Sequence, residues 1–127
     1  MPEPNNPLIS DQLDPVIHAP IRLRICGFLS ALDDAEFMTL RDALGVSDSV
    51  LSKHVKQLVT AGYVVLQKGA LDGRKRAWVR LTPKGRAALL AHVEALIQLA
   101  GQANEGEEES RRREKRPRPE ALRPKLA

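Results

Sequence analysis

The sequence predicts a mainly α-helical domain with one small β-hairpin, and three observations support this fold class. Between Thr39 and Ala61, capping residues and apolar spacing indicate two helices joined by a tight turn at Gly45-Val46. Two β-type runs follow directly, around a loop that contains Asp72-Gly73. Only 3% of the residues are aromatic while 43% are hydrophobic, so the core must be mainly aliphatic, which suits packed helices better than a large sheet.

Length and charge indicate one small domain that favours an anionic partner. The chain has 127 residues and a net charge of +4. Residues 1–13 are polar and proline-rich, and residues 101–127 are dominated by charge, so neither can bury enough apolar surface to offset the entropy of ordering. We therefore expect a folded domain over 14–100 between a flexible N-terminal tail and a disordered C-terminal tail.

Cysteine content and apolar patterning predict a cytoplasmic protein. Cys26 is the only cysteine, so neither an intramolecular disulfide nor a thiolate metal cluster can form within one chain. The N-terminus has no basic and apolar signal segment, and no apolar run reaches the roughly 18 residues that a membrane span needs. We expect no membrane association.

Two prolines predict the first helices. Asp14-Pro15 provides an N-cap and a proline at the first helical position, and Pro20 begins a second helix. Apolar residues at helical spacing predict its core face: Ile21, Ile25, Phe28, Leu29 and Leu32. The opposite side carries small or apolar residues, which predicts a second neighbour for this helix: Leu23, Cys26 and Gly27.

The next two helices form the predicted helix-turn-helix. Thr39 and Asp42 resemble a capping box after a very short strand at 36–38, with Leu40, Ala43 and Leu44 facing inward and Gly45 ending the helix. Ser47 caps the following helix over 47–61, whose predicted buried stripe is Leu51, Val55, Leu58 and Val59. Its opposite arc holds hydrogen-bonding groups and two cations but no acid: Ser49, Ser52, Lys53, Lys56, Gln57 and Thr60.

A hairpin and a last helix complete the domain. The β-runs are Tyr63–Lys68 and Arg76–Leu81, and we expect Trp78 to cover Val64 and Leu66 across the hairpin. The alternative is that Trp78 stacks on DNA or on a partner. Thr82-Pro83 opens a helix with a broad apolar face: Leu89, Leu90, Val93, Leu96, Ile97 and Ala100. This face is wider than one small domain needs.

The 47–61 arc and the hairpin carry the chemistry that DNA recognition requires. Cations bind phosphates, and serine, lysine and glutamine side chains provide donors and acceptors for base edges. The hairpin tip, or wing, at 66–79 adds cations that could clamp phosphates or enter a minor groove: Lys68, Arg74, Lys75 and Arg76. A merely solvated charged surface is the alternative for both regions.

Metal, cofactor and catalytic sites are not predicted. His18, His54 and His92 lie on separate helices and read as surface or boundary residues, and no ligand spacing accompanies them. Cys26 reads as a small hydrophobe. The sequence contains no phosphate-binding glycine loop and no nucleophile elbow, so we expect no enzyme activity.

Residues from Leu13 to about Leu99 resemble the winged-helix transcriptional regulators of the MarR/ArsR type. The resemblance rests on Leu13-Asp-Pro-Val-Ile-His18 with Pro20-Ile-Arg-Leu-Arg-Ile25, on Leu51-Ser-Lys-His-Val-Lys-Gln-Leu58 with Ala61-Gly-Tyr63, and on Arg80-Leu-Thr-Pro-Lys-Gly-Arg86. The ArsR-type cysteine motif and the additional helices that frame many MarR-type ligand pockets are absent from the pattern. The resemblance therefore does not say whether an effector binds.

The resemblance implies a homodimer on palindromic double-stranded DNA. We expect a sequence-specific DNA-binding regulator that represses by steric occlusion rather than one that activates. The implied DNA contacts are Ser49, Ser52, Lys53, Lys56, Gln57, Arg74, Lys75 and Arg76. The implied dimer contact joins the first and last helices through Leu23, Cys26, Gly27, Leu89, Val93, Leu96 and Ile97. The alternatives are a winged-helix module that binds protein, and a chain whose C-terminal tail is a non-specific nucleic-acid tether.

Overall fold

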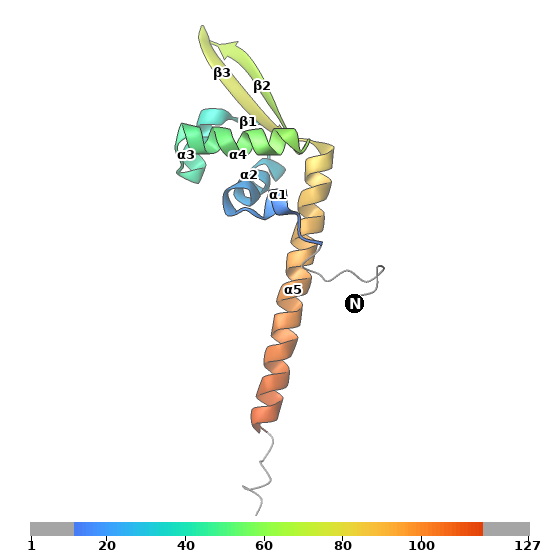
Figure 1. Cartoon of the computed structure of the whole chain (residues 1–127). Helices are drawn as coiled ribbons and strands as arrows, with labels where there is room; N and C mark the ends of the chain where they lie inside the picture. Colours follow the sequence, from blue (N-terminus) through green and yellow to red (C-terminus); the bar gives the residue numbers. More distant parts are fainter. Residues whose placement is uncertain (1–11, 116–127) are drawn as a thin grey trace, which may run out of the picture.

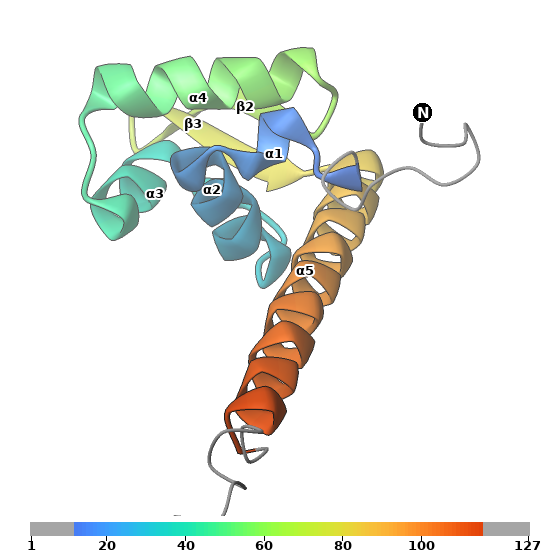
Figure 2. The same ribbon diagram turned by 60° about the horizontal axis from the view of Figure 1, so that its bottom comes forward.

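A computed structural model describes residues 12–115 (Figure 1). The elements in chain order are α1 (Pro15–His18), α2 (Pro20–Ser30), β1 (Ala35–Glu36), α3 (Phe37–Leu44), α4 (Asp48–Thr60), β2 (Val64–Leu71), β3 (Arg74–Leu81) and α5 (Pro83–Lys115). The strands form one antiparallel sheet in the order β1-β3-β2. Figure 2 shows α1 and α2 between α4 and the first half of α5. The predicted mainly α fold with a β-hairpin is confirmed.

Helix caps that the sequence predicted are present at three helix starts. The Asp14 carboxylate accepts from the backbone N–H groups of Val16 and Ile17 at the start of α1. Ser47 Oγ accepts from Val50 N at the start of α4, and Thr82 Oγ1 accepts from Gly85 N at the start of α5. Each cap satisfies donors that have no partner within the helix.

The start of α3 differs from the prediction. The helix begins at Phe37, two residues before Thr39, and Glu36 occupies the cap position without a side-chain cap bond. The strand before it is Ala35–Glu36, which pairs with β3, so residues 37 and 38 are helical rather than extended. Pairing with β3 fixes where the chain turns into the helix. Gly45 ends α3 in the left-handed conformation, with φ of 66°, as predicted.

The wing consists of β2, β3 and the turn at Asp72-Gly73. Both turn residues have positive φ, 53° and 76°, which is typical of a two-residue hairpin turn. The strands pair from Val64↔Leu81 to Leu71↔Arg74, so the hairpin is longer than predicted at its tip. It extends away from the helical body in Figure 1.

Trp78 lies on the other face of the wing from the one predicted. It is opposite Gln67, whereas Val64 and Leu66 are opposite Leu81 and Val79, which are both buried. A Cβ on Gly69 would lie 2.8 Å from the indole Cζ3, so the ring covers the strand at this glycine. The prediction that Trp78 covers Val64 and Leu66 is wrong, because strand alternation places them on opposite faces.

α5 is longer than predicted. It continues to Lys115, and residues 101–115 are all exposed. Pairs at i, i+4 support this part: Arg111 Nη2 is 2.6 Å from Glu107 Oε1, and Arg113 Nε is 3.7 Å from Glu109 Oε1. The prediction of a disordered tail from residue 101 is therefore wrong for residues 101–115, because the glutamates and arginines of this segment are also good helix formers. The rest of both predicted tails, 1–11 and 116–127, lies outside the described residues.

The core is aliphatic and joins the four short helices, the base of the wing and the start of α5. Its largest fully buried apolar side chains are Ile17, Ile25, Leu29, Leu40, Leu51, Leu58, Val55 and Val79. Leu32, Ala43 and Val59, which we expected inside, are exposed. Each lies at the edge of a helical face whose other residues were predicted correctly. Residue spacing alone does not define where such a face ends.

A polar junction joins α1 to α5 inside this body. The buried His92 accepts at Nδ1 from Asp14 N at 3.0 Å, and its Nε2 lies 3.3 Å from His18 Nδ1. The Tyr63 hydroxyl donates to Asp14 Oδ2, and this bond together with burial raises the pKa of Tyr63 to about 12. His92 is thus a core residue, which corrects its prediction as a surface or boundary residue. Asp14 and His18 are far from His92 in the sequence, so no local pattern could indicate these contacts.

Candidate nucleic-acid interface

The outer face of α4 consists of side chains that the sequence placed on one arc. All six are exposed: Ser49, Ser52, Lys53, Lys56, Gln57 and Thr60. The opposite side of the helix is anchored in the core by Leu51, Val55 and Leu58. The helix therefore presents two lysines and several hydrogen-bonding groups to solvent, while its opposite face packs in the core.

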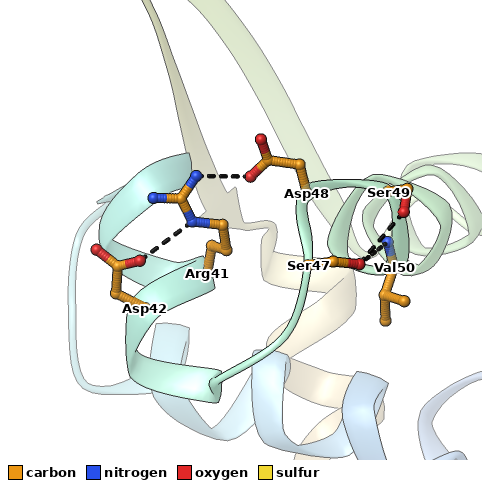
Figure 3. Close-up of polar contacts among 6 residues, drawn as sticks. All are labelled: Arg41, Asp42, Ser47, Asp48, Ser49 and Val50. Carbon is orange, nitrogen blue, oxygen red and sulfur yellow. Dashed lines mark hydrogen bonds and ion pairs between the residues drawn. The ribbon is translucent and has the colours of Figure 1, made fainter.

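Asp48 is the only acid of α4, and it forms an ion pair with an arginine of α3. Arg41 Nη1 on α3 lies 2.7 Å from Asp48 Oδ1, and Arg41 Nε lies 3.1 Å from Asp42 Oδ1 (Figure 3). These hydrogen bonds raise the pKa of Arg41, with Asp48 the larger cause. The bridge connects the two helices across their turn and pairs the acid beside the outer face with a cation, which Asp42 shares. The sequence reasoning missed Arg41, because nothing in the local pattern indicates its partner seven residues away.

Two of the predicted DNA-contact residues on α4 already have partners within the protein. Ser49 Oγ lies 3.2 Å from Ser47 Oγ beside the cap of α4 (Figure 3). Gln57 Oε1 accepts from Arg22 Nη1 on α2. Arg22 was also missed, since 35 residues separate it from Gln57.

The predicted wing cations fall into two groups. Arg74 and Lys75 are exposed next to the turn. Arg76 instead forms an ion pair with Glu36 of β1, and both side chains are largely covered. The structure therefore places Arg74 and Lys75 at the tip, with Lys68 on β2, and gives Arg76 a role in joining the wing to β1.

The residues implied as a dimer contact are also divided. Cys26 and Leu89 are buried in the core of the single chain, which corrects their assignment to an outer surface. Leu23 and Leu96 are half-buried, and Gly27 is exposed. An apolar stripe remains uncovered on α5, formed by Leu90, Val93 and Ile97, which are 63%, 38% and 64% exposed.

Other kinds of site find no support in the described residues. Within 12–115, no three His, Cys, Asp or Glu side chains are grouped in a way that could hold a metal ion. Burial raises the pKa of the Cys26 thiol to about 11, so the nucleophilic thiolate is scarce at neutral pH. None of the helices in this range is both long enough and apolar enough to span a bilayer.

Two solved structures with a similar fold are described as transcriptional regulators or homologues of them. A transcriptional regulator homologue from Pyrococcus horikoshii OT3 is similar with a TM-score of 0.66 and 25% identity, over 69% of this chain and 87% of that one. A MarR family transcriptional regulator from Silicibacter pomeroyi is similar with a TM-score of 0.54 and 28% identity, over 68% of this chain and 56% of that one. The resemblance to MarR-type regulators is confirmed.

Sequence comparison finds a relative and a matching domain family. The uncharacterised protein MJ0432 of Methanocaldococcus jannaschii is 29% identical over 85 residues, which are 67% of this chain and 92% of that protein. The model of the winged helix DNA-binding domain matches residues 21–100, which include both helices of the helix-turn-helix and the whole wing. The chain belongs to the winged helix DNA-binding domain family.

Proposed function

We propose that the protein is a cytoplasmic, sequence-specific transcriptional regulator that binds DNA as a homodimer and represses by occupying its site. The observation that carries this proposal is the outer face of α4. It is exposed, it contains Lys53 and Lys56, and the one acid of its helix is paired with Arg41. The regulators from Pyrococcus horikoshii and Silicibacter pomeroyi support the regulatory role.

The proposed docking places α4 in the major groove. A helix of this width fits that groove, where Lys53 and Lys56 would bind phosphates and Ser49, Ser52 and Gln57 would meet base edges. The wing at 66–79 would reach the flanking groove with Arg74 and Lys75. The side chain of Arg76 would support the wing from within through Glu36.

The proposed homodimer uses the apolar stripe of α5. Leaving Leu90, Val93 and Ile97 in water is unfavourable by about 25 cal/mol per Å² of apolar surface, which a second copy would remove. Leu23, Gly27 and Leu96 lie on the two helices that would meet there. A two-fold contact of this kind would place two α4 helices on two half-sites of a palindrome.

Fluorescence anisotropy with a labelled random duplex tests the proposal across a range of salt concentrations. We expect binding at low salt and release at moderate salt, with log K falling by about 0.9 per log unit of salt for each phosphate neutralised. A specific site should then retain binding at salt concentrations that release random duplex. Absence of duplex binding at low salt would refute the proposal and favour the protein-interaction alternative.

A further inference from the structure

Arg22 on α2 is fixed beside α4 by hydrogen-bond acceptors that carry no charge. Its Nε donates to the carbonyl oxygen of Val16, and its Nη2 lies 3.4 Å from the carbonyl oxygen of Pro15. Its Nη1 donates to Gln57 Oε1 and lies 3.1 Å from His54 Nδ1. Burial, followed by the charge of Arg22, lowers the pKa of His54, which favours the neutral ring that accepts from a guanidinium. Four neutral groups therefore hold the guanidinium in one place.

This environment distinguishes Arg22 from the arginines that join other elements. Arg41 pairs with Asp48, and Arg76 pairs with Glu36, whereas no acid within residues 12–115 forms an ion pair with Arg22. A guanidinium that is paired with a carboxylate attracts a further anion only weakly, because the pair has no net charge. Arg22 keeps its attraction for an anion, and its side chain is already ordered, so binding costs little additional side-chain entropy.

A groove opens directly beside Arg22. It has a volume of about 560 Å³ and lies between α1 and the second half of α4, which are neighbours in Figure 2. The charged side chains that line it are Arg22 and Lys56, and its lining among the described residues contains no acid. The four contacts of Arg22 use four of the five N–H groups of a guanidinium. The remaining N–H, on Nη2, is left for a ligand.

The groove lies where the DNA backbone passes if α4 occupies the major groove. A helix with its side chains is about 10–12 Å across, and the major groove is about 12 Å wide. The two sugar-phosphate strands therefore run along the two sides of the helix. Gln57 and Thr60 line the groove and are exposed on the outer face of α4, so the groove borders that face on one side.

We propose that Arg22 and Lys56 form a phosphate site in this groove, so that α2 binds a backbone phosphate of the duplex together with α4. This inference rests on the proposed function, to which it adds a DNA contact outside the helix-turn-helix and the wing. Hydrogen bonds from a cation to phosphate are roughly twice as strong as bonds between neutral groups. The contact positions the protein on the duplex and reads no base.

The salt dependence of duplex binding tests the site with Arg22→Met and Arg24→Met. Arg22→Met removes one phosphate contact and should reduce the slope of log K against log salt by about 0.9. Arg24 is exposed on the same helix and does not line the groove, so Arg24→Met removes an equal charge and should keep the wild-type slope. Arg22→Lys keeps a cation and should also keep the slope. If Arg22 only supported α4, Arg22→Met would weaken binding without changing the slope.

A second pair of variants leaves the hydrogen bonds of Arg22 intact. Thr60 is exposed and lines the groove, so Thr60→Glu places a carboxylate where it repels a phosphate and pairs with a cation of the site. The slope should fall by about 0.9, as for the loss of one phosphate contact. Thr60→Gln introduces a side chain of the same size without the charge and should keep the slope. This pair decides alone if Arg22→Met fails to fold.

The outcomes separate this inference from the proposed function. If the wild-type chain binds duplex but either folded Arg22→Met or Thr60→Glu keeps its slope, no phosphate occupies the groove. The inference is then wrong while the proposed function stands. If the wild-type chain fails to bind duplex at low salt, both are wrong.

Discussion

α4 and α5 each bury one face in the same core, but their exposed faces differ in chemistry. α4 exposes lysine, serine and glutamine side chains, whereas the first half of α5 exposes Leu90, Val93 and Ile97. Polar and charged groups are stable in water, while exposed apolar groups are not. Exposure of a helix face alone therefore does not identify the kind of molecule that binds it. The chemistry of the exposed face suits α4 to a polyanion and α5 to another apolar surface.

The largest expected effect comes from a substitution in the buried face of α4. Leu51 is fully buried, so Leu51→Ala should lower the free energy of unfolding by about 2–5 kcal/mol through lost burial and a cavity. The adjacent exposed Ser52 is the matched control, and Ser52→Ala should change this free energy by less than about 0.5 kcal/mol. Urea denaturation measures both. Similar losses in the two variants would contradict the division of α4 into two faces.

The next effect concerns the exposed face of α5. Ile97→Glu places a charge in the apolar stripe and should weaken self-association by about 10- to 100-fold, the cost of losing one buried aliphatic side chain. Gln102→Glu adds the same charge at an exposed position further along the helix and should leave association unchanged. Sedimentation at micromolar concentration distinguishes them. A wild-type chain that is strictly monomeric would count against this role of α5.

A smaller effect is expected on the pH dependence of stability, through His92 on the buried face of α5. His92 Nδ1 accepts a backbone N–H, so the folded state requires neutral His92, and burial followed by the charge of His18 lowers its pKa. The unfolded chain then binds the proton more readily. The stabilisation is therefore full above the unfolded pKa of about 6.5 and is lost as pH falls through the lower folded pKa.

The measurement is the free energy of unfolding between pH 7 and pH 5 for the wild-type chain and His92→Gln. Glutamine offers an amide oxygen to Asp14 N without titrating, so its pH profile should be flatter. Parallel profiles would show that the junction between α1 and α5 does not depend on a neutral His92.

Local features of the fold could be predicted from the sequence, whereas distant contacts could not. Ser47, Gly45 and Thr82-Pro83 act through neighbouring backbone groups, so their patterns located helix ends correctly. The exposed arc of α4 followed from helical periodicity. The length of α5 was missed because charged residues that form i, i+4 pairs have the same composition as a disordered segment.

The candidate site was only partly predictable for the same reason. Arg76 was expected on DNA because it is a cation near a turn, yet it pairs with Glu36, 40 residues earlier. Arg22 gave no signal at all, since its role depends on the packing of α2 beside α4. Sequence periodicity indicates which side chains are exposed, but tertiary contacts decide which of their atoms are free.

The salt dependence of duplex binding for Lys53→Ala and Lys56→Ala tests the central claim most directly. Each variant should weaken binding and reduce the slope of log K against log salt by about 0.9, because each removes one phosphate contact. Arg112→Ala is the matched control, since it removes one exposed cation from the far part of α5 and should leave the slope unchanged. If both lysine variants keep the wild-type slope, or if Arg112→Ala reduces it equally, the outer face of α4 does not bind DNA.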